Sequence, residues 1–187
     1  MQVLHVAGLR KFYGPEPVLD GVSFDVFAGD RAGLVGPNGT GKTTLLKIIA
    51  GRESADGGEC LVTSGVKLGY LEQHAEFPEG RTVWEEARTA VQHLIDLQHE
   101  AETTAARLAH TQDPTERRRL AARFDFLQQE LHRLNAYHLD HRIEEVLQGL
   151  GLGPSYYDRP AGQLSGGEQN RLLLAKLLLA EPDLMLL

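Results

Sequence analysis

The sequence predicts an α/β fold in which a strand-rich part is joined to an inserted pair of helices. Three observations support this prediction. Apolar runs bounded by turn residues fill the first 71 residues, as expected for short strands. A glycine-rich loop stands between an apolar run and a helical pattern, and the middle of the chain carries two heptad patterns.

The N-terminal part is predicted to be mostly strands, separated by turns rich in glycine and proline. The third strand runs directly into the glycine-rich loop. After that loop, the apolar spacing of residues 44–50 is helical, and Gly51 stands at the position of a helix C-cap glycine. The predicted strands cover residues 3–9, 18–27, 31–35, 60–62 and 66–71.

The middle of the chain is predicted to be two helices. Thr82-Val83-Trp84-Glu85 has the Thr-x-x-Glu form of a capping box, and Asp113-Pro114 supplies an N-cap aspartate and a proline at the first helical position. The seams fit an antiparallel hairpin, in which each helix buries its stripe on the other, and fit equally well two helices lying flat on the core. The first seam comprises Trp84, Ala87, Val91, Leu94, Gln98, Ala101, Ala105 and Leu108, and the second Leu120, Phe124, Leu127, Leu131 and Leu134.

The C-terminal part is predicted to contain two more helices and a strand. A short helix covers residues 143–150 and leads into a glycine-rich stretch. A very apolar helix runs from Leu164-Ser165-Gly166-Gly167-Glu168-Gln169 to Ala180, and residues 184–187 form a buried strand.

Composition excludes several classes of protein. A formal net charge of −7 and a pI of about 5.6 rule out a chain that is basic throughout, so any contact with RNA must be local. The single cysteine, Cys60, has no partner for a disulfide or a metal site and favours a reducing cytoplasmic setting. The N-terminus lacks the pattern of a secretory signal, and no apolar stretch reaches the ~20 residues of a membrane span.

A phosphate-binding loop is the most specific motif. Gly36-Pro37-Asn38-Gly39-Thr40-Gly41-Lys42-Thr43 fits G-x-x-x-x-G-K-[ST] between an apolar strand and a helix. Glycines let backbone N–H groups curl around phosphates, and the helix N-terminus adds positive potential. The Lys42 ammonium would reach the outer phosphates, and the Thr43 hydroxyl would bind Mg²⁺. The motif therefore predicts ATP or a related nucleotide as ligand.

A second motif indicates which family of P-loop proteins the chain resembles. Leu164 to Gln169 resembles the signature sequence of the ATP-binding cassette (ABC) family, and with the P-loop, Tyr13 and Gln73 in the family's order the resemblance spans nearly the whole chain. It implies a P-loop NTPase core with an antiparallel β subdomain, and a signature segment that closes over ATP held by a partner cassette. The nucleotide-binding residues so implied are Tyr13, Gly36, Pro37, Asn38, Gly39, Thr40, Gly41, Lys42, Thr43, Thr44, Ser165, Gly166, Gly167, Glu168 and Gln169.

Two single residues acquire roles through this resemblance. Tyr13 matches the aromatic that stacks on adenine, and Gln73 matches the glutamine that contacts Mg²⁺ and the attacking water, so Gln73 joins Lys42 as a catalytic residue and Thr43 as a metal ligand. Base stacking on an aromatic contributes about 1–3 kcal/mol. The alternatives are a turn tyrosine packed on the sheet and a solvated glutamine at a strand end.

The insert between Gln73 and Leu164 suggests the branch of the family. It is longer than the helical subdomain of a transporter cassette, and the chain resembles the first cassette of an ABC-F protein. That resemblance implies a second cassette in the same polypeptide and a helical arm, here Thr82 to Asn135, that contacts the ribosome. Arg117-Arg118-Arg119 and Arg123 at the arm's tip are candidates for RNA phosphate contacts. The arm as a whole is not basic, so a solvated helix face is the alternative.

The chain also departs from the family. The aspartate and glutamate that an ABC cassette places after its last apolar strand are not among residues 1–187, and neither is the switch histidine. Losing a water-activating group costs a factor of about 10² to 10⁴ in rate. We therefore expect an incomplete core, formed by residues 1–80 and 151–187 with a helical subdomain at 81–150, which binds ATP without useful turnover.

Three functions are compatible with these motifs. The first is the N-terminal part of an ABC-F ATPase that acts on the ribosome in translation or antibiotic resistance. The second is the nucleotide-binding subunit of a membrane transporter, which a co-purifying membrane subunit would support. The third is a module that binds nucleotide or dimerises without catalysis.

Overall fold

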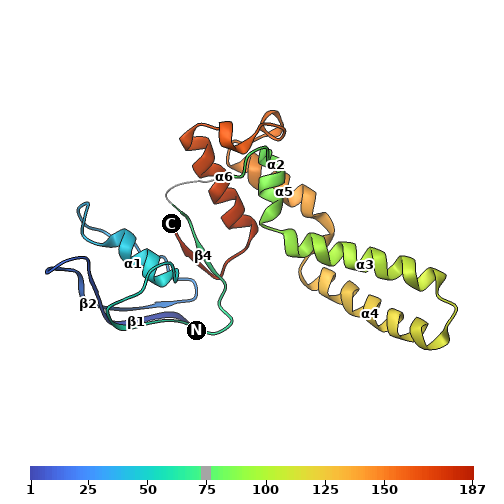
Figure 1. The fold of residues 1–187 in the computed structure, drawn as a ribbon, viewed down its shortest axis with the longest axis horizontal. Coiled ribbons are helices and arrows are strands. Elements are labelled where there is room, and N and C mark those ends of the chain that lie inside the picture. The colour runs from blue at the N-terminus through green and yellow to red at the C-terminus, as the bar shows by residue number, and fades with distance from the viewer. Residues whose placement is uncertain (73–76) are drawn as a thin grey trace. The chain divides into compact units, whose positions relative to one another are not determined.

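The computed structural model describes residues 1–72 and 77–187, and they form two compact units. The first, here called the β unit, holds Met1–Gln73 and Glu181–Leu187, and the second, the helical unit, holds His74–Ala180. Each unit has a hydrophobic core of its own. Their elements are labelled in Figure 1.

A three-stranded antiparallel sheet forms most of the β unit. Its strands are β1 (Gln2–Phe12), β2 (Pro17–Phe27) and β3 (Gly57–Val62), in the order β2-β1-β3. The prediction of an antiparallel β subdomain is confirmed. The β1–β3 register shifts near Gly8, and a Cβ on Gly58 would lie only 2.3 Å from the Gly8 carbonyl oxygen, so glycine is required at this irregularity.

A short parallel pair of strands and one helix complete this unit. Strand β4 (Leu68–Tyr70) pairs in parallel with β5 (Leu184–Leu186), which brings together residues 116 positions apart in the sequence. Helix α1 (Lys42–Ile49) follows the glycine loop. Its apolar side joins a core built from Val3, Leu4, Val6, Leu9, Leu19, Leu45, Ile48, Ile49, Leu184 and Leu186.

The strand predicted at residues 31–35 is not formed. The segment carries no strand assignment, and Val35 is 94% exposed and Leu34 47% exposed. An extended segment becomes a strand only where a neighbour satisfies its N–H and C=O groups. Among the described strands, β4 and β5 pair only with each other, so residues 31–35 have no ladder partner.

The helical unit consists of five α-helices and three 3₁₀ turns among the described residues. The predicted capping box is confirmed, since Glu85 N donates to Thr82 Oγ1 at 3.2 Å and Thr82 N donates to Glu85 Oε2 at 2.9 Å. The elements are α2 (Val83–Thr89), α3 (Gln92–His110), α4 (Pro114–Arg133), η1 (Ala136–His138), α5 (Leu139–Gly149), η2 (Pro154–Tyr156), η3 (Ala161–Gln163) and α6 (Gly166–Leu179).

The first predicted heptad helix is broken. Helix α2 ends at Thr89 and α3 begins at Gln92, although the apolar seam continues through Val91. At the break, Ala90 N and Val91 N donate three residues back along the chain, at 3.2 and 3.1 Å, as in a tightened 3₁₀ turn. Val91 is fully buried, so the break keeps the seam residue in the core while redirecting the helix.

Helices α3 and α4 form an antiparallel hairpin, the first of the two predicted alternatives. Within the helical unit the hairpin extends away from the other helices (Figure 1). Asp113 caps α4 by accepting from Thr115 N at 3.0 Å, and Gln98 Nε2 donates to the Ala136 carbonyl at 2.5 Å. The buried residues of the hairpin are Leu94, Ala101 and Thr104 on α3 and Leu120, Leu127 and Leu131 on α4. Thr104 was not predicted, and the predicted Ala105 and Leu108 are only half-buried.

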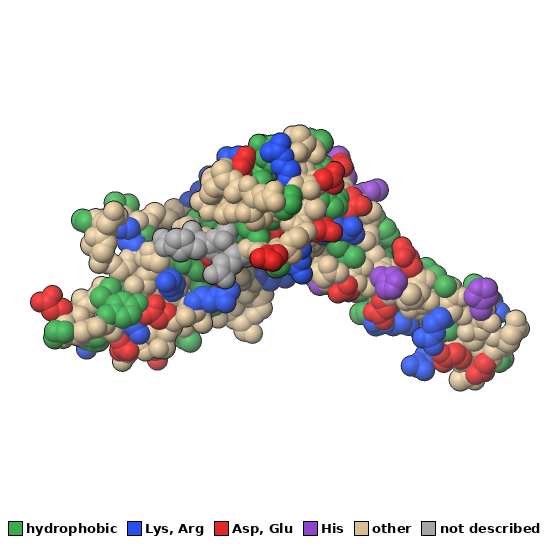
Figure 2. All heavy atoms as spheres, turned by 45° about the horizontal axis from the view of Figure 1, so that its top comes forward, with side chains coloured by type: hydrophobic (Ala, Val, Ile, Leu, Met, Phe, Trp, Pro, Cys, Tyr) green, Lys and Arg blue, Asp and Glu red, His purple; other side chains and the backbone are tan. Residues whose placement is uncertain are grey.

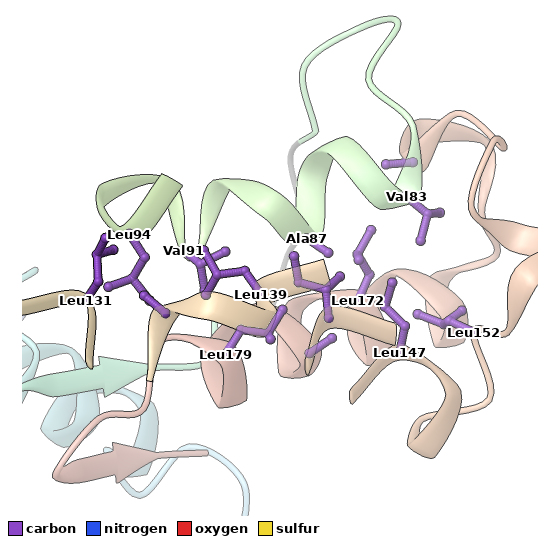
Figure 3. Close-up of a cluster of buried hydrophobic side chains, with 14 of the residues drawn as sticks. Val83, Ala87, Val91, Leu94, Leu131, Leu139, Leu147, Leu152, Leu172 and Leu179 are labelled. Carbon is purple, nitrogen blue, oxygen red and sulfur yellow. The ribbon is translucent and has the colours of Figure 1, made fainter. Parts of the chain in front are cut away.

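The core of the helical unit lies where α2, α5 and α6 meet the base of the hairpin. Figure 3 shows its side chains pointing toward one another from these helices. One charged pair is part of this region, because the Lys176 ammonium of α6 donates to the Glu86 carboxylate of α2, and Glu86 is 3% exposed. Fully buried members of the core include Val83, Ala87, Val91, Ile143, Leu147, Leu152, Leu172 and Ala175.

Candidate nucleotide-binding site

The predicted phosphate loop, residues 36–43, is curled around its own lysine. The Lys42 Nζ donates to the carbonyl oxygens of Gly36 and Pro37 at 2.7 and 2.6 Å. The Thr40 hydroxyl donates to the same Pro37 carbonyl at 2.9 Å. The ammonium therefore satisfies two loop carbonyls, and binding of a phosphate would exchange these contacts for charged ones.

Glycine is required at position 41 for two reasons. Its φ is 83°, in the left-handed region that glycine adopts without strain. A Cβ there would lie 2.9 Å from the Val18 carbonyl oxygen and 2.9 Å from side-chain carbons of Val18 and Leu19. The start of β2 therefore packs directly against the loop.

The N-terminus of α1 provides a favourable setting for an anion. The helix begins at Lys42, has eight residues, and carries no acidic residue in its first turn. Thr43 and Thr44 lie in that first turn and are half-buried. The N–H groups of a helix's first turn and the helix dipole attract phosphate at such a terminus.

Tyr13 lies in the same unit, in the turn between β1 and β2. Its ring is exposed, at 64% for the residue, and its hydroxyl donates to the Glu53 carboxylate. The Lys11 Nζ lies 5.5 Å from the ring centroid. The tyrosine is thus not packed into the sheet, which was the alternative that the sequence left open.

The signature segment lies in the helical unit, where it opens α6. Ser165 is the N-cap residue, and both its backbone N and its Oγ donate to Glu168 Oε2 at 2.7 Å. The Tyr156 hydroxyl donates to Glu168 Oε1 at 2.9 Å. These bonds, the one from the Ser165 hydroxyl first, lower the pKa of Glu168 to about 2, so the carboxylate is ionised at neutral pH.

The remaining predicted residues are placed as follows. Gly39 has a φ of 86° within the loop, and Asn38 is exposed there. Gly166, Gly167 and Gln169 occupy the first turn of α6. Gln73 lies outside the described residues.

Sequence reasoning missed three residues beside the predicted ones, namely Lys11, Glu53 and Tyr156. Lys11 and Glu53 contact Tyr13, and Tyr156 contacts Glu168. Lys11 lies two residues before Tyr13, but its charge stands beside that of Arg10 and did not single it out. The other two lie 40 and 12 residues from their partners, so no local pattern connects them.

The glycine-rich loop bends around the Lys42 side chain and leads directly into α1. This arrangement is that of a P-loop nucleotide-binding protein. A family model described as ABC transporter matches residues 19–187, so the chain belongs to the ATP-binding cassette family and is an ATP-binding cassette. The prediction of that family is confirmed. In the part of the chain that the structure describes, no helix has the length and apolar character needed to cross a membrane.

Several curated proteins resemble the chain along its whole length. It is 33% identical to the uncharacterized ABC transporter ATP-binding protein YfmM of Bacillus subtilis, over 100% of the chain and 36% of that protein. It is 36% identical to the tylosin resistance ATP-binding protein TlrC of Streptomyces fradiae, over 98% and 34%. It is 35% identical to the energy-dependent translational throttle protein EttA of Mycobacterium tuberculosis, over 96% and 31%. The chain thus spans about a third of the length of these relatives.

Solved structures confirm the predicted P-loop cassette fold. One, described as the ATP-binding subunit of an ABC transporter, aligns with a TM-score of 0.65 at 20% identity, over 98% of this chain and 64% of that one. Another, from a complex of an archaeal ribosomal stalk protein with the ribosome recycling factor aABCE1, aligns with a TM-score of 0.61 at 26% identity, over 100% and 27%.

Proposed function

We propose that this chain is the first ATP-binding cassette of an ABC-F type protein that couples ATP binding and cassette closure to action on the ribosome, in translation or in antibiotic resistance. The observation that carries the proposal is the α3–α4 hairpin, which is inserted between β4 and α6. The relatives with names that refer to translation and tylosin resistance match the chain across this insert.

In this proposal the β unit holds ATP with Mg²⁺. The Lys42 ammonium and the N–H groups of residues 36–43 bind the phosphates, and Tyr13 stacks on the base. Thr43 and Gln73 would hold Mg²⁺, and the bound ion would supply positive charge that neutralises the phosphates. The role of Lys42 is supported by the loop geometry, and the roles of Tyr13, Thr43 and Gln73 by the motif order.

The signature segment serves a partner cassette. Ser165 and Gly166 at the N-terminus of α6 would meet a phosphate of ATP held by the partner's P-loop. In the present structure the Ser165 hydroxyl donates to Glu168, so it has to rotate before it can donate to that phosphate. The partner is a second cassette, on the same polypeptide or on another chain.

Residues 1–187 by themselves are proposed to bind ATP without useful turnover, because the acidic pair that the family uses is not among them. ATP hydrolysis would be measured for the chain and for its Lys42→Ala variant. Equal, negligible rates with Lys42-dependent ATP binding are expected. Lys42-dependent turnover would show that another base lies within these residues.

The hairpin is the proposed ribosome contact. Figure 2 shows basic and acidic side chains interleaved along it, so the whole surface is not positive. Two arginines at the tip are nevertheless exposed and make no ion pair with a described residue, namely Arg117 and Arg118. By contrast, Arg119 pairs with Glu116 at 3.4 Å and Arg123 with Glu100 at 2.6 Å.

Co-sedimentation with ribosomes in the presence of ATP tests this function. The double variant Arg117→Glu, Arg118→Glu is expected to lose most binding and to reduce the slope of log affinity against log salt by about 1.4 to 1.8. The double variant Arg31→Glu, Lys67→Glu, at two exposed basic residues of the β unit, is the control with the same change in charge. Unchanged ribosome binding by the Arg117→Glu, Arg118→Glu double variant would show that Arg117 and Arg118 are not the contact. Absence of ribosome binding by the unmutated chain, together with co-purification of a membrane subunit, would favour the transporter alternative.

A further inference from the structure

Lys11, at the end of β1, is a buried charge with a complete set of partners. It is 8% exposed, and its Nζ donates to the Ser54 carbonyl at 2.8 Å. The carboxylates of Glu53 and Asp56 lie 3.5 and 3.6 Å from the same nitrogen. Lysine is seldom buried unless it is paired, so this cluster holds the loop after α1 against the end of β1.

Backbone contacts make the same connection from the other side. Phe12 N donates to Asp56 Oδ2 at 2.8 Å, and Asp56 N donates to the Arg10 carbonyl at 2.9 Å. These bonds fix the backbone on both sides of Lys11. Tyr13 follows Phe12 directly, so the backbone that leads into Tyr13 is held by these hydrogen bonds.

Tyr13 itself is held at two points although it is exposed. Its hydroxyl donates to the Glu53 carboxylate, and the Lys11 ammonium lies 5.5 Å from the centre of its ring. A tyrosine that only packs would be buried, whereas this residue is 64% exposed. An aromatic ring fixed in an exposed position is a preorganised surface for a planar ligand, since its ordering cost is met before binding.

The location of this ring connects it to the phosphate loop. The turn that holds Tyr13 leads into β2, and the first residues of β2, Val18 and Leu19, pack against Gly41 of the loop. All of these residues belong to the β unit. The exposed ring therefore stands on the segment that directly supports the loop proposed to bind the triphosphate.

We propose that Glu53 and Lys11 are positioning residues, which hold Tyr13 in place as a stacking surface for the purine base without touching the nucleotide. This inference rests on the proposed role of Tyr13 and goes beyond it, because it assigns the geometry of the base site to a carboxylate 40 residues away in sequence. The contribution of the purine base to the ATP affinity then depends on Glu53, whereas the contribution of the phosphates does not.

Isothermal titration with two probes, Mg²⁺-ATP and Mg²⁺-tripolyphosphate, tests the inference on the whole chain. Tyr13→Ala is expected to weaken ATP binding about 5- to 150-fold, the full stacking contribution. Tyr13→Phe, which keeps the ring, and Glu53→Ala are each expected to weaken ATP binding by about 2- to 12-fold, the cost of one hydrogen bond, and by no more than Tyr13→Ala does. Tripolyphosphate affinity is expected to stay unchanged in all three variants.

The double variant Tyr13→Phe, Glu53→Ala gives the decisive readout. If the hydroxyl acts through Glu53, the double variant binds ATP no more weakly than Glu53→Ala alone, since that single variant already removes the contact of the Tyr13 hydroxyl. The control is Glu59→Ala, an exposed carboxylate on β3 that forms no hydrogen bond or ion pair with a described residue, and it should bind ATP normally.

Each other outcome overturns a distinct statement. If Tyr13→Ala leaves ATP affinity intact, the proposed stacking role of Tyr13 is wrong. If Tyr13→Ala weakens ATP binding while Tyr13→Phe and Glu53→Ala do not, stacking stands and the anchoring inference fails. If the fold-losses in ATP affinity of the two single variants multiply in the double variant, the hydroxyl does not act through Glu53 and the inference is overturned. If the affinity for tripolyphosphate falls in parallel with that for ATP, Glu53 acts through the fold and the inference is again overturned.

Discussion

Ser165 and Glu168 form a closed pair at the start of α6, in which the backbone N and the hydroxyl of Ser165 both donate to one carboxylate oxygen at 2.7 Å. The pair combines two uses of the same residues. It caps the helix, and it holds the hydroxyl that the signature motif is proposed to offer to a nucleotide. The hydrogen bond that stabilises the start of α6 therefore keeps the Ser165 hydroxyl from donating to a nucleotide.

This pair predicts a pH-dependent effect of Glu168→Gln. The folded-state pKa of Glu168, about 2, is below its ordinary value of 4.5, so its contribution to stability is present above pH 4.5 and is lost as the pH falls toward 2. The difference in melting temperature between wild type and variant is expected to be largest at neutral pH and to shrink across that window. A difference that stays constant from pH 7 to pH 2.5 would contradict the assignment.

A second prediction concerns the buried Glu86. Lys176→Met removes its closest partner and leaves Arg81, whose nearest nitrogen lies at 3.4 Å and whose side chain is 49% exposed. Removing one member of a buried pair costs about 3–5 kcal/mol, because the other charge stays buried.

Urea denaturation measures this cost, and a paired variant provides its control. The double variant Glu86→Leu, Lys176→Met is expected to recover most of the lost free energy of unfolding, since it removes the buried carboxylate as well. Additive losses in the double variant would mean that the two residues stabilise the unit independently.

The motifs were predictable because their information is local. The P-loop glycines, the Thr82 capping box and the Asp113 N-cap each depend on residues within a few positions of one another, and the structure forms them as expected. The same holds for the second seam, since the heptad period alone places Leu120 and Leu127 on one face of α4.

What could not be predicted depends on distant partners. An apolar run at residues 31–35 has the composition of a strand, yet pairing is a property of neighbouring strands. The break at Val91 falls inside an uninterrupted apolar seam, so the heptad pattern gives no sign of it. The contacts of Glu53 with Tyr13 and of Glu86 with Lys176 join residues 40 and 90 positions apart.

The phosphate loop gives a third prediction, on Gly41→Ala. The variant would combine a φ of 83° with a Cβ 2.9 Å from the Val18 carbonyl. We expect a loss of stability of about 1–3 kcal/mol and a loss of ATP binding of at least 10-fold, because the loop has to move away from β2.

Gly51→Ala is the matched control for this strain. Gly51 has a φ of 67°, and no atom lies within 4 Å of the position of its added Cβ. It should show the cost of the left-handed conformation alone and leave ATP binding intact. Equal effects of the two variants on both measurements would show that the contact with Val18 is unimportant.

The hairpin gives the last prediction, on what holds α3 and α4 together. Leu127 is fully buried in the seam, so Leu127→Ala removes packed methyl groups and leaves a cavity. Glu100→Ala, by contrast, breaks only an exposed ion pair with Arg123. Expected losses in free energy of unfolding are about 2–5 kcal/mol for the leucine and about 0–1 kcal/mol for the glutamate. Chemical denaturation in low and high salt separates the two contributions, because only an ion pair is screened. If Glu100→Ala costs as much as Leu127→Ala, and that cost disappears in high salt, the hairpin is held by charge and the leucine seam is secondary.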